Sequence, residues 1–482
     1  MFAVLFLIQV SCRGAQKNRL VTYPAPAGAK KAAGYRVFVN GREIFVYDNP
    51  VAAFAYFDFS GRAEVEIRAT ADVKWVDVRP RRRQITPAWD DSTIRFTLTE
   101  PVKISVELNG FFDGSVKPLF LFANAPEKDI PGRDDPDVLF FEGGKIYDVG
   151  MLELKRNQTV YIAGGAIVKG CLFASKARHV VIRGRGILDA TGILSNIKDG
   201  RVPWVRAVNF LRCQDVRVEG ITVSNSDTWQ VVPVWSEDVT ITGVNLISGN
   251  PSDDGIDIVR CRNVLIENCF IRVKDDCIAI KALFDDPENR GDSNIVVQHC
   301  TLWNAEWGSA MEIGFETRAL VMQDITFRDM DIIHVERGAV MSIHNGDEAL
   351  VRNVHYEDIR IEDPADKLID MAVFRSQYSR DRPATPTETE LLYMHGVWDG
   401  VIKVPESDSA YHAKFRGEIR NISFKNIRVT DGKLPFSVIC GFDKNHEIRD
   451  VVIDGLYLCG KKVRNKSEGR FYIKDAEKIS FE

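Results

Sequence analysis

The sequence predicts an all-β protein in which a right-handed parallel β-helix follows an N-terminal β-sandwich domain. Two observations predict this fold class: short alternating strands with turn signals in the first part of the chain, and a loose repeat of strand-like units in the remainder. The chain has 482 residues, of which 45% are hydrophobic and 27% charged, as in an ordinary soluble globular protein. This length suits one long repeat domain with an additional domain.

The first residues resemble a secretory signal. Residues 1–10 are almost wholly apolar, and the sequence then becomes polar and basic. The apolar run is too short to cross a bilayer. Ser11-Cys12 resembles a bacterial lipoprotein processing site, with Cys12 as the lipidated residue. We therefore expect residues 1–16 to be a signal segment, and the protein to be secreted, periplasmic or anchored to a surface by a lipid on Cys12.

Residues 17–128 predict the β-sandwich. Short runs such as YRVFVNGREIFVYD alternate apolar and polar residues, and Asn40-Gly41 between two such runs is a strong hairpin signal. Many short strands at this spacing favour two packed antiparallel sheets. The stretch NAPEKDIPGRDDPD, rich in proline and charge, marks a linker to the second domain, which we place at residues 129–482.

The second domain repeats a unit of two or three β-forming residues, a polar or glycine turn and a further strand. A unit that cannot bury its own apolar face must stack on its neighbours, which predicts a parallel β-helix with right-handed crossovers. A leucine-rich horseshoe is the main alternative, but its asparagine-leucine frame is absent. An amphipathic cap is expected near 140–155 and a large inserted loop at 363–418. The repeats begin at Val216, Val239, Val264, Ile295, Ile325, Val354, Ile422 and Val451.

Charge and cysteine content exclude several function classes. A formal net charge of −5 and a pI near 6.0 argue against nucleic acid or an anionic membrane surface as a partner. The nine cysteines show no metal-binding spacing, and we expect no metal and no cofactor. Cys269 and Cys300 occupy matching positions in two repeats, which favours a stacked pair of thiols over a disulfide.

Residues 252–281 contain five aspartates in two clusters, each followed by a strand-like apolar run. If these strands are successive rungs about 4.8 Å apart, three carboxylates crowd one small surface. Carboxylates at that density repel one another, so at least one pKa should rise and the site should hold both an acid and a base. A solvated acidic turn and a cation site are the alternatives. The aspartates are Asp253, Asp254, Asp257, Asp275 and Asp276.

The motifs NSDTW, SDDGIDI and DDCIAIK together resemble the polygalacturonase family, glycoside hydrolase family 28. The resemblance places Asp254, Asp275 and Asp276 on the three catalytic aspartates of that family. It implies that Asp275 donates a proton to the leaving oxygen while Asp254 and Asp276 hold the attacking water. Inversion at the anomeric carbon calls for an acid and a base about 6.5–9.5 Å apart. Asp257, three residues past Asp254, should face the other way and be structural.

The chain departs from the family pattern in the next two repeats. Gly308-Ser309-Ala310 stands where the family has Gly-His-Gly, and Val340-Met341-Ser342 stands where it has the Arg-Ile-Lys that grips a uronate. Losing two cations argues against plain polygalacturonate as the substrate. Other polar residues are candidates for binding the sugar, each with a structural alternative, as is Arg318. They are Asn225, Asp227, Trp229, Lys281, Glu312, Glu316, Arg337 and His344.

An N-terminal sandwich before a β-helix also resembles glycoside hydrolase family 49, the dextranases and isopullulanases, which act on neutral α-glucans. The sequence thus predicts a hydrolase of a polysaccharide or oligosaccharide, pectin-type or α-glucan-type. Two alternatives stay open. One is a polysaccharide lyase in which the aspartates bind Ca²⁺, and the other is a carbohydrate-binding β-helix without catalysis.

Overall fold

The computed structural model describes residues 18–110, 116–192, 205–382 and 409–482. The expected signal segment at 1–16, with Cys12, lies outside the described residues, so secretion and lipid anchoring stay predictions. Among the described residues, no helix is both long and apolar enough to span a bilayer. Three β-sheets account for nearly all regular structure there, together with one 3₁₀ turn, η1 (Arg81–Arg83), and one short helix, α3 (Ser409–Ala413).

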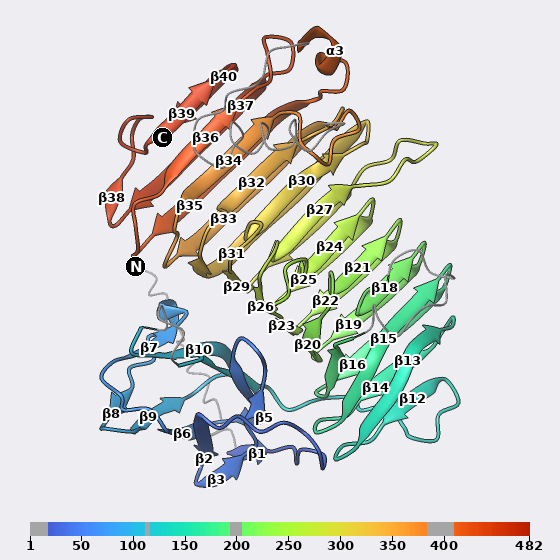
Figure 1. The fold of residues 1–482 in the computed structure, drawn as a ribbon, viewed down its shortest axis with the longest axis vertical. Helices are drawn as coiled ribbons and strands as arrows, with labels where there is room; N and C mark the ends of the chain where they lie inside the picture. The colour runs from blue at the N-terminus through green and yellow to red at the C-terminus, as the bar shows by residue number, and fades with distance from the viewer. Residues whose placement is uncertain (1–17, 111–115, 193–204, 383–408) are drawn as a thin grey trace, which may run out of the picture.

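Two sheets form the N-terminal sandwich (blue in Figure 1) and enclose a core that includes Val37, Phe57 and Ile104. The expected hairpin at Asn40-Gly41 is confirmed, with Val39 opposite Arg42. The six-stranded sheet contains β1 (Arg19–Val21), β5 (Ala53–Ser60), β11 (Leu119–Asn124), β10 (Val102–Leu108), β7 (Val76–Arg79) and β4 (Tyr47–Asp48). The five-stranded sheet contains β3 (Arg42–Ile44), β2 (Tyr35–Val39), β6 (Ala63–Ala69), β9 (Thr93–Leu98) and β8 (Ala88–Trp89).

The 29-stranded sheet is the right-handed parallel β-helix, and its strands form three faces (Figure 1). The first face contains β12 (Val138–Phe141), β14 (Thr159–Ile162), β16 (Arg178–Gly184), β19 (Gln214–Glu219), β22 (Glu237–Thr242), β25 (Arg262–Glu267), β28 (Ser293–Gln298), β31 (Val321–Val335), β33 (Leu350–Ile361), β35 (Glu418–Val429), β37 (Ile448–Leu458) and β40 (Ala476–Phe481). The second contains β13 (Ile146–Leu154), β15 (Ile167–Ser175), β17 (Ile187–Ala190), β20 (Thr222–Ser226), β23 (Asn245–Ile247), β26 (Phe270–Val273), β29 (Thr301–Asn304) and the end of β31.

The third face begins at the end of β15 and carries the site described below. Its strands are β18 (Val208–Leu211), β21 (Val231–Val234), β24 (Ile256–Val259), β27 (Ile278–Ala282), β30 (Met311–Thr317), β32 (Ala339–Asn345), β34 (Lys367–Val373), β36 (Phe436–Cys440) and β39 (Phe471–Lys474). A short strand, β38 (Lys461–Lys462), pairs with β37 antiparallel. The expected cap at 140–155 coincides with β12 and β13, the first rung of the helix, so its role as a cap stays a prediction. One expectation is wrong: the inserted segment at 363–418 contains the rung β34.

The predicted repeats stack in a single register. Val216 pairs with Val239, Val239 with Val264, and the same column continues through all eight predicted positions to Val451. Each of these residues is at most 3% exposed, because it points into the helix interior. The hydrophobic repeat therefore sets the register, since a shift of one residue would turn each apolar side chain outward.

A left-handed residue precedes each repeat and explains why asparagine and aspartate recur there. Asp238, Asn263 and Asn294 have φ between 54° and 58°, a region these short polar side chains tolerate. Their side chains also bond from rung to rung: Asn263 Nδ2 donates to Asp238 Oδ1 at 3.0 Å, and Asn294 Nδ2 donates to Asn263 Oδ1 at 2.9 Å. The ladder fixes the turn where each first-face strand begins.

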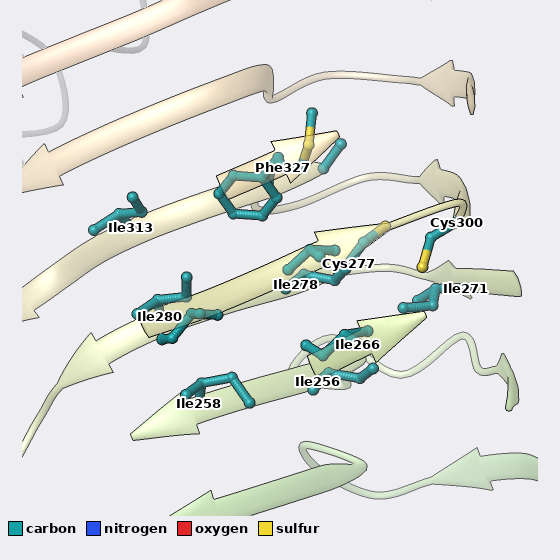
Figure 2. Packing of buried hydrophobic residues seen from close by; sticks show 14 of the residues in the cluster. Ile256, Ile258, Ile266, Ile271, Cys277, Ile278, Ile280, Cys300, Ile313 and Phe327 are labelled. Carbon is teal, nitrogen blue, oxygen red and sulfur yellow. The ribbon is translucent and has the colours of Figure 1, made fainter. Parts of the chain in front are cut away.

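The interior of the β-helix is a column of aliphatic side chains and thiols. Figure 2 shows Ile258, Ile280 and Ile313 stacked on successive third-face strands, with Cys300 nearby. Cys269 and Cys300 are free and buried, and the backbone N–H of Cys269 donates to Cys300 Sγ at 3.4 Å, which confirms the stacked thiol pair. Close packing of this kind allows little movement of the strands that position the site.

The sandwich packs against the second face of the β-helix through an apolar and an ionic contact. Phe120 and Phe122 from β11 pack on Phe270, with ring centroids 4.8 and 5.3 Å apart. Nearby, Arg79 pairs with Glu107 of the sandwich at 3.3 Å and with Glu362 of the helix at 3.1 Å. All six side chains are buried, so the second face is closed to solvent along these rungs.

Candidate active site

The three aspartates that the sequence singles out lie together at one corner of the β-helix. Asp254 precedes β24, while Asp275 and Asp276 lie in the turn between β26 and β27. We call the stacked turns between the second and third faces the active-site corner. One oxygen of each of these carboxylates lies within 4.8 Å of the others. The stacking of successive rungs thus brings the three carboxylates together, as the sequence repeat predicts.

Lys281, at the end of β27, lies among these carboxylates. Its Nζ is 2.8 Å from Asp254 Oδ2, 3.0 Å from Asp257 Oδ1 and 3.7 Å from Asp276 Oδ2. The ammonium also lies 4.0 Å from the centroid of the Trp229 ring. Because the side chain of Lys281 is only 7% exposed, its charge acts on these carboxylates with little screening by solvent.

Asp257 corrects an expectation. Counting alternation from Asp254 places Asp257 on the opposite face, yet it shares the ammonium of Lys281. The strand β24 begins only at Ile256, so the turn residues Asp254 and Gly255 do not obey strand alternation. Asp257 is fully buried, and the neighbouring Asp254 carboxylate adds to burial in raising its pKa.

Backbone hydrogen bonds hold the carboxylates in place. Asp276 Oδ1 accepts from the backbone N–H of Ser309 at 2.7 Å, and Asp275 Oδ1 accepts from that of Asp276 at 3.0 Å. Asp253 Oδ1 accepts from the N–H groups of Lys274 and Asp275 at 2.8 and 3.1 Å. Asp253 is therefore a structural clamp on the turn, whereas Asp275 is the most exposed of the four corner aspartates at 253, 254, 275 and 276.

Burial and mutual repulsion raise the pKa of two of the aspartates. Burial, followed by the negative charge of Asp254, raises the pKa of Asp275 to about 8. Burial also raises the pKa of Asp276, but there the ammonium of Lys281 is the strongest opposing influence. Burial lowers the pKa of Lys281, and the carboxylates of Asp254 and Asp257 outweigh it, so the lysine stays charged. The corner therefore combines a carboxyl group that is protonated at neutral pH with a buried cation.

Comparison with known proteins identifies the family of the chain. A model described as glycosyl hydrolases family 28 matches residues 169–440, more than half of the chain. The chain belongs to glycosyl hydrolases family 28.

Individual relatives of the family 28 chain are distant. It is 25% identical over 194 residues to a probable polygalacturonase of Vitis vinifera, covering 38% of this chain and 39% of that protein. It is 21% identical over 266 residues to polygalacturonase QRT2 of Arabidopsis thaliana, covering 54% and 52%. The chain thus spans about two fifths to one half of the length of these curated relatives.

One solved structure resembles the family 28 chain over nearly its whole length. Dex49A from Penicillium minioluteum aligns with a TM-score of 0.57 and 15% identity, covering 95% of this chain and 96% of that one. At this identity the likeness concerns the fold alone.

A second polar cluster lies on the third face and includes Ser342, at the position where the family resemblance places a lysine. Glu312, Ser342 and Asp370 are in register on β30, β32 and β34. His344 Nδ1 lies 2.9 Å from Glu312 Oε1, and its Nε2 lies 3.3 Å from Asp370 Oδ2. Lys367 Nζ donates to Asp370 Oδ2 at 2.6 Å. The cluster is buried and pairs its own charges, so we infer that it supports the floor of the third face.

The acids of that cluster keep the histidine protonated. Burial lowers the pKa of His344, but Glu312 and Asp370 outweigh it and raise the pKa to about 9. Glu316, on the same strand as Glu312, is 8% exposed, and burial raises its pKa against the opposing charge of Lys281.

The remaining predicted residues lie at different distances from the corner. The Trp229 ring contacts the ammonium of Lys281 at the corner, and its centroid also lies 4.6 Å from the guanidinium carbon of Arg206. Asp227 Oδ1 accepts from the backbone N–H of Gly192 at 3.1 Å. Asn225 Oδ1 accepts from Asn49 Nδ2 of the sandwich at 3.1 Å. The NSDTW motif therefore splits, with its tryptophan at the corner and its asparagine at the domain contact.

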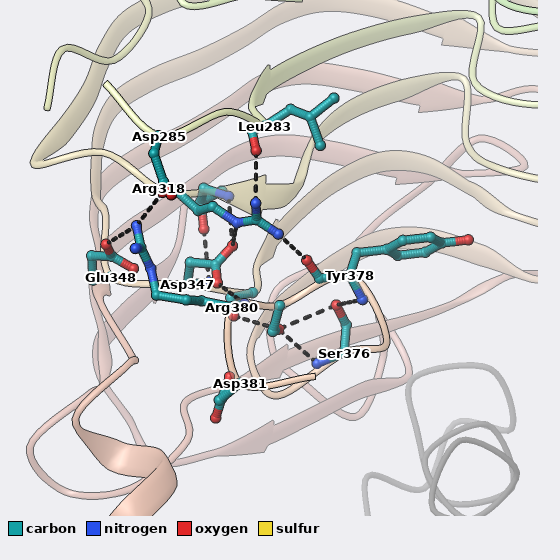
Figure 3. Close-up of polar contacts among 12 residues, drawn as sticks. Leu283, Asp285, Arg318, Asp347, Glu348, Ser376, Tyr378, Arg380 and Asp381 are labelled. Carbon is teal, nitrogen blue, oxygen red and sulfur yellow. Dashed lines mark hydrogen bonds and ion pairs between the residues drawn. The ribbon is translucent and has the colours of Figure 1, made fainter. Parts of the chain in front are cut away.

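Arg318 holds a loop instead of lying with the aspartates (Figure 3). Its guanidinium donates to the carbonyl oxygens of Leu283 and Tyr378 at 2.9 and 2.8 Å, and its Nε lies 3.7 Å from Asp347 Oδ2. Arg380 similarly pairs with Asp285 at 2.9 Å. These contacts fix the segment after β34 at the far end of the third-face strands.

Three residues of the corner were not singled out from the sequence for their contacts: Gly308, Trp307 and Arg206. Gly308 has a φ of +61°, and a Cβ there would lie 2.5 Å from Asp275 Oδ1. The glycine was noticed only as part of a motif that lacks histidine. The dipeptide Trp307-Gly308, one rung past DDCIAIK, is the sequence signal that would have identified both of these residues.

Proposed function

We propose that this protein hydrolyses a glycosidic bond in a pectin-type polysaccharide or oligosaccharide, with Asp254, Asp275 and Asp276 as its catalytic residues. The observation that carries the proposal is the unequal environment of three adjoining carboxylates. Lys281 pairs with Asp254 and Asp276, while no ion pair joins it to Asp275 among the described residues. Such a site offers both of the roles that glycoside hydrolysis needs.

Asp275 is the proposed general acid. Its pKa of about 8 keeps it protonated at neutral pH, and it is the partly exposed member of the three, so it can reach a leaving oxygen. The family resemblance supports the same assignment at the first aspartate of DDCIAIK.

Asp254 and Asp276 are the proposed acceptors for the attacking water. Asp254 Oδ2 is bonded to Lys281, and Asp276 Oδ1 is bonded to the N–H of Ser309, so each carboxylate has a fixed orientation. Fixed acceptors hold a water at low entropic cost when the sugar binds.

The stereochemistry of cleavage is the decisive test, because the separation of the carboxylates does not by itself establish inversion. The nearest oxygens lie within 4.8 Å, closer than the about 6.5–9.5 Å between carboxyl groups that inversion usually requires. We propose inversion, with the water held beside the acid by Asp254 and Asp276. Proton NMR of the first anomer released should show the configuration opposite to that of the substrate; retention would contradict the proposal.

A lyase using Ca²⁺ is the second candidate, favoured by the clustering of the three carboxylate oxygens. The ammonium of Lys281 already neutralises part of this charge, which weighs against a divalent cation. Reducing-sugar assays on pectic and α-glucan substrates, run with and without a chelator, separate the two. A product that absorbs in the ultraviolet, and whose formation stops with chelation, would favour the lyase.

A further inference from the structure

Trp307 and Arg337 form an exposed pair in the two turns that follow the aspartates along the active-site corner. Trp307 is 38% exposed, and the Arg337 guanidinium, also exposed, lies 4.8 Å from the centroid of its ring. A tryptophan and an arginine so exposed beside a buried acidic corner have no evident role in packing.

The turns that carry this pair are in direct contact with the aspartates. The backbone N–H of Cys277 donates to the carbonyl of Ser309 at 3.0 Å, and that of Ala310 donates to the carbonyl of Ala339 at 2.9 Å. Asn304 Nδ2 donates to the carbonyls of Asp275 and Trp307, both at 2.7 Å. Successive rungs lie about 4.8 Å apart. A glycan that lies over the aspartates and follows the helix axis therefore meets Trp307 and then Arg337.

The charge of Arg337 is available to a ligand. Within the described ranges no carboxylate forms an ion pair with it, whereas the neighbouring Lys274 pairs with Glu306 at 2.7 Å. Glu336, the adjacent residue, accepts a hydrogen bond from Trp303 Nε1 at 2.9 Å. A guanidinium presents paired donors that match a carboxylate, while an indole face packs against the apolar face of a sugar ring.

A cation at the corner matters more because the floor of the third face has a serine where the family resemblance places a lysine. Ser342 occupies the position where the family resemblance places a lysine, and it donates to the buried carboxylate of Glu312. At this position the floor therefore presents a serine bonded to a buried glutamate, whose charge is paired with His344. A uronate carboxylate directed at the corner would meet Arg337.

We propose that Trp307 and Arg337 form a subsite for an acidic sugar, with the indole under the sugar ring and the guanidinium on its carboxylate. The inference rests on the proposed function, because it takes the aspartates as the point of cleavage. It moves uronate recognition from the floor of the third face to the active-site corner.

Binding to the full-length Asp275→Asn variant tests the subsite apart from catalysis. The probes are an α-1,4-linked trigalacturonate and the same trisaccharide with its carboxyls reduced to alcohols, each titrated by calorimetry. Arg337→Gln in this background should weaken binding of the acidic probe by about tenfold, the scale of a charge-assisted pair, and leave the neutral probe unchanged. Trp307→Ala should weaken both probes.

Arg212→Gln is the matched control, because Arg212 lies 4.6 Å over the Trp235 ring at the opposite end of β21. It should change neither affinity. Equal affinities of the two probes, or an unchanged preference in Arg337→Gln, would overturn the subsite. Reducing-sugar release by the wild-type enzyme is measured separately. Hydrolysis without dependence on Arg337 refutes the subsite alone, and Arg337-dependent binding without hydrolysis refutes the proposed function alone.

Discussion

At the scale of single residues, Lys281 is the cation that opposes the effect of burial at the clustered carboxylates. Its ammonium pairs with Asp254 and Asp276, and its side chain is only 7% exposed, so the charge interacts more strongly than at the surface. Among the described residues no such ion pair joins it to Asp275, and burial raises the pKa of Asp275 to about 8. In the proposed mechanism, this one cation distinguishes the acid from the two acceptors.

The pH dependence of turnover follows from this division. Because Asp275 must be protonated to act as the proposed acid, kcat/KM should fall as pH rises through about 8, where the raised pKa of Asp275 places its deprotonation.

Lys281→Met removes the charge that opposes burial at Asp276, so the pKa of Asp276 rises further and an acceptor is lost at neutral pH. The variant should be less active, with the acidic limb of its profile displaced to higher pH.

Two companions complete that experiment. Lys281→Arg keeps the positive charge and should retain more activity than Lys281→Met. Lys274→Met removes an ammonium that pairs with Glu306 instead of with the proposed catalytic aspartates, and should leave the profile in place. Circular dichroism establishes that each variant folds. A Lys281→Met profile identical to the wild type in shape and position would refute the role of Lys281.

At the scale of single elements, the turn before β30 is shaped to fit the aspartates. A Cβ on Gly308 would lie 2.5 Å from both Asp275 Oδ1 and the backbone nitrogen of Asp276, at a φ of +61°. Gly308→Ala should therefore displace the catalytic turn, and a displacement of about 1 Å can cost about 10²-fold in turnover. Turnover numbers of the purified variant check this.

Gly144→Ala separates the two effects of that substitution. Gly144 has a similar φ of +76°, but a Cβ there meets no atom within 4 Å. It carries the cost of the left-handed conformation, about 1–2 kcal/mol, without contacting the aspartates. Its turnover should match the wild type. If both alanine variants lost activity equally, backbone strain and not crowding of Asp275 would be the cause.

The rungs themselves could be predicted from the sequence, and the corner only in part. Val216 and its seven counterparts fall in one column because an apolar period is a local signal that survives in the fold. The orientation of Asp257 could not be predicted, because strand alternation begins only after the turn. The partners of Lys281 and the contact of Gly308 depend on side chains brought together across rungs. A single sequence does not encode such distances in any readable pattern.

At the scale of the whole molecule, the sandwich and the β-helix share a buried ionic contact. Arg79 bonds with Asp77 and Glu107 on the sandwich and with Glu362 on the helix, and His334 lies 3.1 Å from Glu107. The side chain of Arg79 is 5% exposed. We propose that residues 17–128 and 129–482 are two structural units joined by this contact and by the aromatic contact beside it.

Breaking this contact should destabilise the whole chain. Arg79→Met removes the cation that three buried carboxylates share, although Asp77 keeps Arg81 and Glu107 keeps His334. The loss should lower the free energy of unfolding by about 3–5 kcal/mol, the scale for a broken buried pair. Denaturant unfolding followed by tryptophan fluorescence measures it. Arg36→Met removes an arginine paired with Glu43 on the exposed face of the sandwich, and should change the midpoint little. Equal midpoints for both variants would show that the contact adds no stability.

The position of the sandwich also bears on how the chain reaches its fold. Its β5 and β11 face carries Phe54 and Phe120, which cover an apolar strip of the β-helix running from Ile167 to Ile333. During synthesis the sandwich is complete before any rung exists, and domains generally fold as units from the N-terminus. Each new rung then condenses on a wall that is already present, so we expect the β-helix to assemble in one direction, from β12 toward β40.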